Sequence, residues 1–324
     1  MHLVNDIDDV RSSKIAVMEI VPFHFGDAVA MKIRSLRHCF CLGLDPHLSF
    51  IPPAFRRGSM KPLSPTTITA LEDFLVAVID RAIGRAVAIK PQSAMYERLG
   101  SAGVALLERV VAYARSRGIL VLLDAKRGDI AATAEAYAEA YLMPDSPNPV
   151  DGLTVNPYMG SDTLEPFLKL SGLYGRGVFV LVKTSNPGSG EFQDLAIGNT
   201  TLFATVASAL APCAERLRGP ETGWSSLGVV VGATYPGEAE AIRRLLPSSL
   251  FLIPGFGYQS GDLDKIVSSL VPGPVCLEGG LISSSRATLF PEQAMSEQAG
   301  TWRSAFEDHL ARTVQSVVVA CKLE

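Results

Sequence analysis

Short apolar runs alternate with longer amphipathic stretches along almost the whole chain. The runs are apolar throughout rather than at every second position, which is typical of parallel strands covered on both faces. Helix-length amphipathic stretches between them include residues 66–83, 103–117, 200–216 and 238–246. The eight apolar runs are residues 39–44, 86–89, 120–123, 152–155, 178–182, 227–231, 250–253 and 274–277. This alternation predicts repeated strand–helix units with right-handed crossovers.

Eight strand–helix units fit a (β/α)8 TIM barrel, a fold of the α/β class. An open, doubly wound sheet is the competing architecture, but it would carry a GxGxxG fingerprint after an early strand, and the sequence has none. We therefore predict a single barrel domain over residues 36–324. Residues 1–35 form an N-terminal extension, in which Phe25, Val29 and Ile33 share one face of a short helix. We expect this helix to close the bottom of the barrel.

The composition excludes several classes of protein. The chain has 324 residues, of which 48% are hydrophobic and 19% are charged, so it can form a large core and shows no sign of bulk disorder. Its net charge of −4 argues against a nucleic-acid-binding protein, which usually carries a basic surplus. No apolar run is long enough to cross a bilayer, and the N-terminus lacks a signal-like apolar core. We expect a cytoplasmic protein that binds neither membranes nor nucleic acids.

The cysteines do not form a metal-binding pattern. They are odd in number and include neither a CxxC pair nor a Cys/His cluster with zinc spacing. The five are Cys39, Cys41, Cys213, Cys276 and Cys321. We interpret them as buried apolar thiols in a reducing compartment and predict no metal site.

Polar residues follow several predicted strands at the end where TIM-barrel enzymes place their active sites. The first run ends in Asp45, the second in Lys90, the third in Asp124 and the fourth in Asn156, and Ser185 lies in the loop after the fifth. The carboxyl ends of barrel strands surround one small opening. We therefore expect these side chains to converge there rather than to form a solvated surface.

The third strand end carries the most informative segment, LLDAKRGDIAAT at residues 122–133. Asp124 and Lys126 are two residues apart on the last extended positions, so both can point to the same side. Asp129 lies in the turn beyond them, where it could instead cap the next helix beside a surface salt bridge. Because Asp45 and Lys90 end two earlier strands, we favour a catalytic cluster over this structural alternative.

The loops after the seventh and eighth runs predict a phosphate site, because phosphate commonly binds at these loops in TIM barrels. The seventh run leads into PGFGYQSG at residues 254–261, where Gln259 can donate a hydrogen bond. Glu278 follows the eighth run, and Arg286, further on, can bind phosphate oxygens bidentately. Backbone N–H groups can approach an anion at Gly255, Gly257 and Gly261. A flexible glycine loop beside a surface arginine is the structural alternative.

Seven motifs, in this order and spacing, make the chain similar to orotidine 5'-monophosphate decarboxylases from about Phe40 to the final helix. They are GLDP at 43–46, AIKPQ at 88–92, DAKRGD at 124–129, TVNPYMG at 154–160, KTSNPGS at 183–189, PGFGYQSG at 254–261 and SSR at 284–286. Several resemble the longer, bacterial-type branch of the family. The resemblance implies a barrel that removes CO2 from C6 of orotidine 5'-phosphate and leaves UMP, without a cofactor or metal.

The resemblance also implies roles for individual residues. Lys126 would face C6 in an alternating Lys90–Asp124–Lys126–Asp129 array, stabilise the developing carbanion and deliver the proton. In this family the second aspartate of the motif comes from the partner subunit, so a homodimer would complete each site. The partner would contribute Asp129, Ile130 and Thr133, and the other substrate-binding residues would be Asp45, Asn156, Ser185, Pro254, Gly257, Gln259 and Arg286.

Two alternatives remain open. A related barrel uses the same DxKxxD element with Mg²⁺ on sugar phosphates, but those relatives carry Glu where this chain has Lys90, and a cation there would repel Mg²⁺. A non-catalytic nucleotide-binding barrel would be expected to show a damaged charged array, yet all four members are present. The sequence departs from the family where Tyr258 and Ser260 replace the expected Ala and Gly of the phosphate loop.

Overall fold

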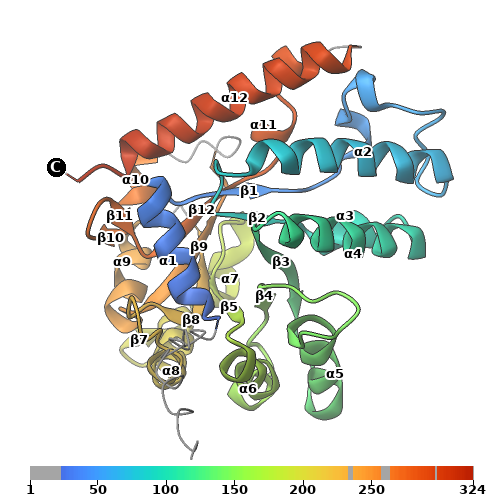
Figure 1. Ribbon diagram of the computed structural model, residues 1–324. Coiled ribbons are helices and arrows are strands. Elements are labelled where there is room, and N and C mark those ends of the chain that lie inside the picture. The colour runs from blue at the N-terminus through green and yellow to red at the C-terminus, as the bar shows by residue number, and fades with distance from the viewer. Residues whose placement is uncertain (1–22, 233–235, 257–262, 296–297, 324) are drawn as a thin grey trace, which may run out of the picture.

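Eight parallel strands close into a barrel in the computed structural model, which describes residues 23–232, 236–256, 263–295 and 298–323 (Figure 1). Around the barrel the order is β1-β12-β9-β8-β5-β4-β3-β2. The strands are β1 (Phe40–Gly43), β2 (Ala88–Lys90), β3 (Leu120–Arg127), β4 (Gly152–Val155), β5 (Gly177–Lys183), β8 (Ser225–Val231), β9 (Ser249–Pro254) and β12 (Gly280–Ser284). The predicted (β/α)8 barrel is confirmed.

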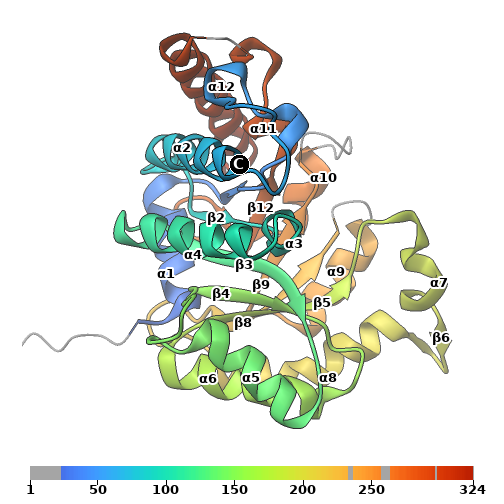
Figure 2. The ribbon, with the colours of Figure 1, turned by 90° about the vertical axis from the view of Figure 1, so that its right-hand side faces the viewer.

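The longer helices surround this ring (Figure 2), and their apolar faces are buried. In α2, for example, Pro65 occupies the first turn, where its missing N–H costs nothing, and Leu71, Phe74 and Val78 form the buried stripe. The longer helices are α2 (Pro65–Ala82), α4 (Ser101–Ser116), α5 (Ala131–Leu142), α6 (Glu165–Tyr174), α8 (Leu202–Arg216), α9 (Pro236–Leu245) and α12 (Ala299–Ala320). The four helical stretches predicted from residue 66 to residue 246 correspond to α2, α4, α8 and α9.

Shorter elements lie in the loops between these units. The short helices are α3 (Ser93–Glu97), α7 (Gly190–Gln193), α10 (Leu263–Val267) and α11 (Arg286–Leu289), and the 3-10 turns are η1 (Leu48–Phe50), η2 (Pro53–Phe55), η3 (Ser161–Leu164), η4 (Pro187–Ser189) and η5 (Glu292–Ala294). Two small hairpins pair β6 (Ala196–Ile197) with β7 (Thr200–Thr201) and β10 (Val271–Pro272) with β11 (Leu277–Glu278). In Figure 2 the segment with α7 and β6 extends away from the barrel strands.

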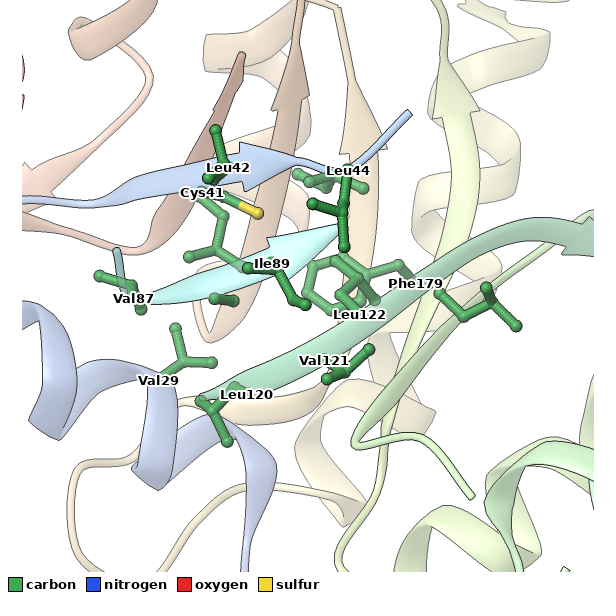
Figure 3. Close-up of a cluster of buried hydrophobic side chains, with 14 of the residues drawn as sticks. Val29, Cys41, Leu42, Leu44, Val87, Ile89, Leu120, Val121, Leu122 and Phe179 are labelled. Atoms are coloured by element: carbon green, nitrogen blue, oxygen red, sulfur yellow. The ribbon is translucent and has the colours of Figure 1, made fainter. Parts of the chain in front are cut away.

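The N-terminal helix α1 (Phe25–Leu36) packs at the end of the barrel where the strands begin. Its predicted inner face is confirmed, because Phe25, Val29 and Ile33 are fully buried. Figure 3 shows Val29 beside Val87 and Leu120, which lie at the starts of β2 and β3. Fully burying such a side chain contributes about 2 kcal/mol. The helix therefore belongs to the same core that holds the strands in place.

The eighth strand was predicted at residues 274–277, and that prediction is wrong. Leu277 belongs to the β10–β11 hairpin, and the barrel strand is β12. Its sequence, GLISS, ends in two serines that are buried, and the Ser284 hydroxyl pairs with Thr288 Oγ1 at 2.8 Å. A strand with two polar residues at its end does not form a continuous apolar run and therefore was not predicted. As a consequence, Glu278 precedes β12 and lies at the opposite end of the barrel from the strand ends that carry Lys90 and Asp124.

Candidate active site

Three charged side chains meet at the carboxyl ends of β2 and β3. Lys90 Nζ donates to Asp124 Oδ2 at 2.9 Å, and Lys126 Nζ donates to Asp124 Oδ1 at 2.5 Å. Lys90 and Asp124 are buried, whereas the Lys126 side chain keeps 40% of its surface exposed. The predicted convergence of these residues is confirmed. We call this trio the rim cluster.

The pairing within the rim cluster determines the charge of its buried members. Burial alone would raise the pKa of Asp124, but the ammonium groups of Lys90 and Lys126 outweigh it and hold that pKa well below its usual range. Burial alone would lower the pKa of Lys90, but the carboxylates of Asp124 and Asp45 raise it above its usual value. Lys90 and Asp124 are therefore both charged at neutral pH.

The contact between Lys126 and Asp124 depends on a bulge in β3. The register pairs Leu123 with Leu153 and Arg127 with Val155, so three residues of β3 stand opposite one residue of β4. Lys126 has a φ of 48°, in the left-handed region that few residues other than glycine adopt. We expected Asp124 and Lys126 to make this contact by sharing one side of a regular strand, because they are two residues apart. The structure reaches it through the bulge, which turns the Lys126 side chain back towards the carboxylate.

A cavity of about 220 Å³ opens beside the rim cluster. Asp45 lies in its wall, where Oδ1 accepts the backbone N–H of Gln92 at 3.1 Å and Oδ2 accepts the Ser285 hydroxyl at 2.5 Å. The lining residues are Asp45, His47, Lys90, Pro254, Gly255, Phe256, Ser283, Ser285, Arg286 and Ala287. Four of the predicted site residues, from four strand ends, therefore share one cavity.

The predicted phosphate loop is described only at its start. Pro254 ends β9, and Gly255 has a φ of 104°, which only glycine adopts readily. Gly257 and Gln259, with Tyr258, Ser260 and Gly261, lie outside the described residues. Arg286 is exposed at the mouth of the same cavity. Pro254 and Arg286 thus occupy the positions expected for a phosphate site.

Asn156 and Ser185 lie further around the rim. Asn156 Oδ1 accepts the backbone N–H of Tyr158 at 3.0 Å, and the residue lines a second, mainly apolar cavity of about 450 Å³ below α7 and α8. Ser185 is half-buried after β5. It lies so close to Gly232 that a Cβ there would come within 2.9 Å of it. In the part of the chain that the structure describes, neither side chain forms an ion pair or a hydrogen bond with Lys90, Asp124 or Lys126, so both lie beside the rim cluster rather than in it.

Asp129, Ile130 and Thr133 follow the rim cluster of their own chain in sequence, and all three are at least partly exposed. Asp129 Oδ1 accepts the backbone N–H of Ile130 at 2.8 Å, and among the described residues it forms no ion pair with Lys126. Ile130, which is 59% exposed, is itself the N-cap of α5, so the alternative in which Asp129 caps that helix is wrong. Thr133 is also exposed. None of the three residues is buried within this chain.

This geometry can be compared with known proteins. The sequence pattern of the orotidine 5'-phosphate decarboxylase / HUMPS family matches residues 39–287, which is more than half of the chain. The chain belongs to this family.

Relatives in the family are similar over most of their length. A protein of Rhodopirellula baltica named orotidine 5'-phosphate decarboxylase is 38% identical over 283 residues, which cover 85% of this chain and 91% of the relative. The protein of that name from Caldicellulosiruptor bescii is 34% identical over 256 residues, covering 75% and 83%. A crystal structure of the putative Streptomyces avermitilis enzyme superposes with a TM-score of 0.74 at 34% identity, covering 92% and 96%.

Several site residues of this family member were not predicted. Thr154 on β4 is fully buried and its hydroxyl contacts Asp124 at 3.0 Å. His47 and Ser285 line the cavity that holds Asp45. Lys183, at the end of β5, is fully buried, forms an ion pair with Asp194 and lies 5.7 Å from the centre of the Phe203 ring. Each lies within or next to one of the seven motifs, which was the available signal.

The remaining predictions concern metals, thiols and membranes. Within residues 23–232, 236–256, 263–295 and 298–323, no group of three histidines, cysteines or acidic residues could hold a metal ion. The cysteines are free, and all except the half-buried Cys213 are buried, as predicted. Over the same ranges, no helix combines the length and apolar character needed to cross a membrane.

Proposed function

We propose that this chain decarboxylates orotidine 5'-phosphate to UMP and CO2 in pyrimidine biosynthesis. The observation that carries the proposal is the rim cluster, in which Asp124 holds one ammonium group on each carboxylate oxygen. It adjoins a cavity that contains Asp45 and Arg286. A nucleotide that placed its phosphate near Arg286 could extend its base towards Lys126. Family membership supports the same substrate.

The chemistry requires a stabilised electron pair on carbon. When the bond between C6 and the carboxyl group breaks, CO2 leaves and the electron pair stays on C6. An ammonium group held against C6 stabilises this charge and then donates its proton there, giving UMP. We assign this role to Lys126, because its ammonium has donors beyond the one directed at Asp124, and its side chain is 40% exposed. Asp124 keeps this lysine aimed.

The reaction needs neither a cofactor nor a metal in this proposal. The electrostatic stabilisation comes from protein ammonium groups, and Lys90 and Lys126 together would repel a divalent cation. In a Mg²⁺-dependent relative, a carboxylate would be expected where Lys90 stands. This difference in charge separates the two kinds of barrel.

Substrate binding is distributed over the other strand ends. We propose that Asp45 and Lys90 contact the ribose hydroxyls and that Ser185 contacts the edge of the pyrimidine. Asn156, at the end of β4, would be a further substrate-binding residue. Pro254, Gly257, Gln259 and Arg286 would form the phosphate site. Binding energy from this remote dianion can then be used in the transition state rather than only for substrate affinity.

The proposal includes a cytoplasmic homodimer. Among the described residues Asp129 forms no ion pair with Lys126, and Ile130 exposes a large apolar side chain. In the dimer, Asp129 and Thr133 would complete the neighbouring site and extend its array to four charges. We assign residues 36–324 to the barrel domain and residues 1–35 to the extension that carries α1.

The direct test is turnover by the purified full-length chain. Orotidine 5'-phosphate is added after thorough treatment with EDTA, and loss of ultraviolet absorbance is followed as UMP forms. Full turnover in EDTA is the expected result. A strict requirement for added Mg²⁺, or binding of UMP without any turnover, would contradict the proposal. Lys126→Ala protein, purified in parallel, controls for a contaminating host enzyme.

A further inference from the structure

The Thr154 side chain lies at the centre of the β3 bulge. Its hydroxyl oxygen accepts the backbone N–H of Ala125 at 3.0 Å and that of Lys126 at 2.9 Å. The same hydroxyl lies 3.0 Å from Asp124 Oδ1, to which it donates. Thr154 is fully buried, so water does not compete for these bonds. One side chain thus contacts three successive residues of the strand that carries the rim cluster.

The direction of these hydrogen bonds is determined by chemistry. A hydroxyl group has two lone pairs and one proton. Both lone pairs of Thr154 Oγ1 accept backbone N–H groups, so its proton is left for Asp124. The charged carboxylate can only accept. The hydroxyl therefore has a single arrangement in which every partner is satisfied, and this arrangement orients Asp124.

The bulge needs such a partner. Three residues of β3 stand opposite the single position 154 of β4. The regular hydrogen bonds between the two strands therefore provide too few carbonyl acceptors for the backbone N–H groups of these three residues. Lys126 also has a left-handed backbone, which a lysine adopts rarely without support from its surroundings. A hydroxyl at position 154 supplies the missing acceptor. An apolar side chain of the same shape would leave the backbone N–H groups of Ala125 and Lys126 without this acceptor.

We propose that Thr154 is a positioning residue for Lys126 and Asp124. Its hydroxyl holds the bulge in the conformation that brings the Lys126 ammonium onto Asp124 Oδ1. Its contribution to turnover rests on the proposed decarboxylase activity, whereas its contribution to the bulge does not.

The kinetic test compares Thr154→Val, which keeps the shape and removes the hydroxyl, with Thr154→Ser, which keeps the hydroxyl. Val should lower kcat on the order of 10²-fold, with KM within about threefold, because a small misplacement of a catalytic group has effects of that size. Ser should keep kcat within about threefold. Near-normal kcat in the Val variant, or equal damage in both variants, would overturn the proposal. If the Val variant fails to fold, Thr154→Cys, whose sulfur is a weak acceptor, replaces it under the same criteria.

The matched control is Thr163→Val. Thr163 is also buried, in the loop after β4, which is the strand that carries Thr154. Its hydroxyl donates to the backbone carbonyl of Gly160. It does not contact the rim cluster. Its kcat should stay within about twofold of the wild type, because loss of one local hydrogen bond affects stability rather than the array. A drop as large as that of Thr154→Val would show that the effect is not specific to the bulge.

Crystal structures of the Thr154 variants test the same proposal without any activity. In the variant without the hydroxyl, Lys126 should leave the left-handed region and its ammonium should move off Asp124. The Ser variant should keep both features. An unchanged bulge in the variant without the hydroxyl would overturn the proposal. A wild-type chain that does not decarboxylate orotidine 5'-phosphate would contradict the proposed function and leave this structural criterion to decide on Thr154.

Discussion

Two charge clusters, each built on a buried carboxylate, lie at opposite ends of the same barrel. The rim cluster is Lys90, Asp124 and Lys126 at the carboxyl ends of the strands. The base cluster consists of Arg34, Trp224 and Glu278 at the end closed by α1. In the base cluster, Glu278 accepts Arg34 at 2.8 and 2.9 Å through both carboxylate oxygens, and accepts the Trp224 indole N–H at 2.9 Å.

The two clusters differ in how completely their donors are used. In the base cluster, the fork of Arg34 matches both oxygens of Glu278, and the indole donor adds a third bond, which is a strong and rigid arrangement. In the rim cluster, the Lys126 ammonium directs one bond at Asp124 and its side chain remains part-exposed, on a backbone in the left-handed region. A carboxylate whose donors are all engaged with it stabilises the fold. A cluster in which an ammonium group has unused N–H donors can also bind a ligand.

The largest effect is expected for Lys126→Ala. It removes both the cation and the proposed proton donor, so kcat should fall by about 10⁴-fold or more. Stability should change little, because the side chain is part-exposed. The matched control is Lys32→Ala near the base, whose ammonium donates to the Gly118 carbonyl, and it should keep normal kcat. A near-normal rate in Lys126→Ala, measured by the absorbance assay, would refute the assignment.

Removing the carboxylate of the base cluster should affect stability instead. Glu278→Ala leaves Arg34 and the Trp224 N–H without their partner and should lower the free energy of unfolding by about 3–5 kcal/mol. The control is Glu307→Ala, which breaks an exposed ion pair with Arg85 and should cost at most about 1 kcal/mol. Urea unfolding measures both. If kcat per folded molecule fell in Glu278→Ala, the separation of the two ends would be wrong.

The rim should also differ from the base in needing a second chain. Asp129→Ala alone should lower kcat by about 10²-fold, since one charge of the array is lost. Mixing Lys126→Ala with Asp129→Ala chains should then restore roughly a quarter of wild-type activity, because half of the dimers are hybrids and each hybrid has one intact site. No recovery, despite subunit exchange shown by mass spectrometry, would argue that each site is complete within one chain.

The smallest effect is a difference in acid sensitivity. Burial lowers the pKa of His38, near the base, to about 4. The unfolded chain binds this proton near pH 6.5, so stability from the neutral ring is complete above that pH and is lost as pH falls towards 4. The loss should be about 3 kcal/mol and should be absent in His38→Gln, as measured by urea unfolding across this range.

The rim cluster should not contribute to that loss. The depressed pKa of Asp124 gives stability that is complete above its unfolded value near 4 and is lost only below it. The raised pKa of Lys90 gives stability that is complete below its unfolded value near 10. Their pair should therefore be constant from about pH 5 to 9. A titration step of the Asp124 carboxyl carbon in that range, seen by NMR, would contradict this contrast.

The strand–helix repeat, seven of the eight strands and the polar residue that ends several of them can be predicted from the amino-acid sequence alone. These features are local: a strand covered on both faces must be apolar along its length, and the chain turns outward where the apolar run stops. The buried face of α1 follows from helical spacing in the same way. The motifs extended this local information to the family.

Other features depend on contacts between elements that are far apart in the chain. The strand GLISS can end in buried serines because the Ser284 hydroxyl pairs with that of Thr288 on α11. Glu278 can be buried because Arg34 of α1 donates to its carboxylate. The left-handed backbone of Lys126 depends on the Thr154 hydroxyl from the next strand. A hydrogen bond between two different elements does not alter the hydrophobic periodicity of either one, so it cannot be predicted from that periodicity. Hydrophobic spacing could therefore place the strand ends, but the packed barrel was needed to show how their charges are held.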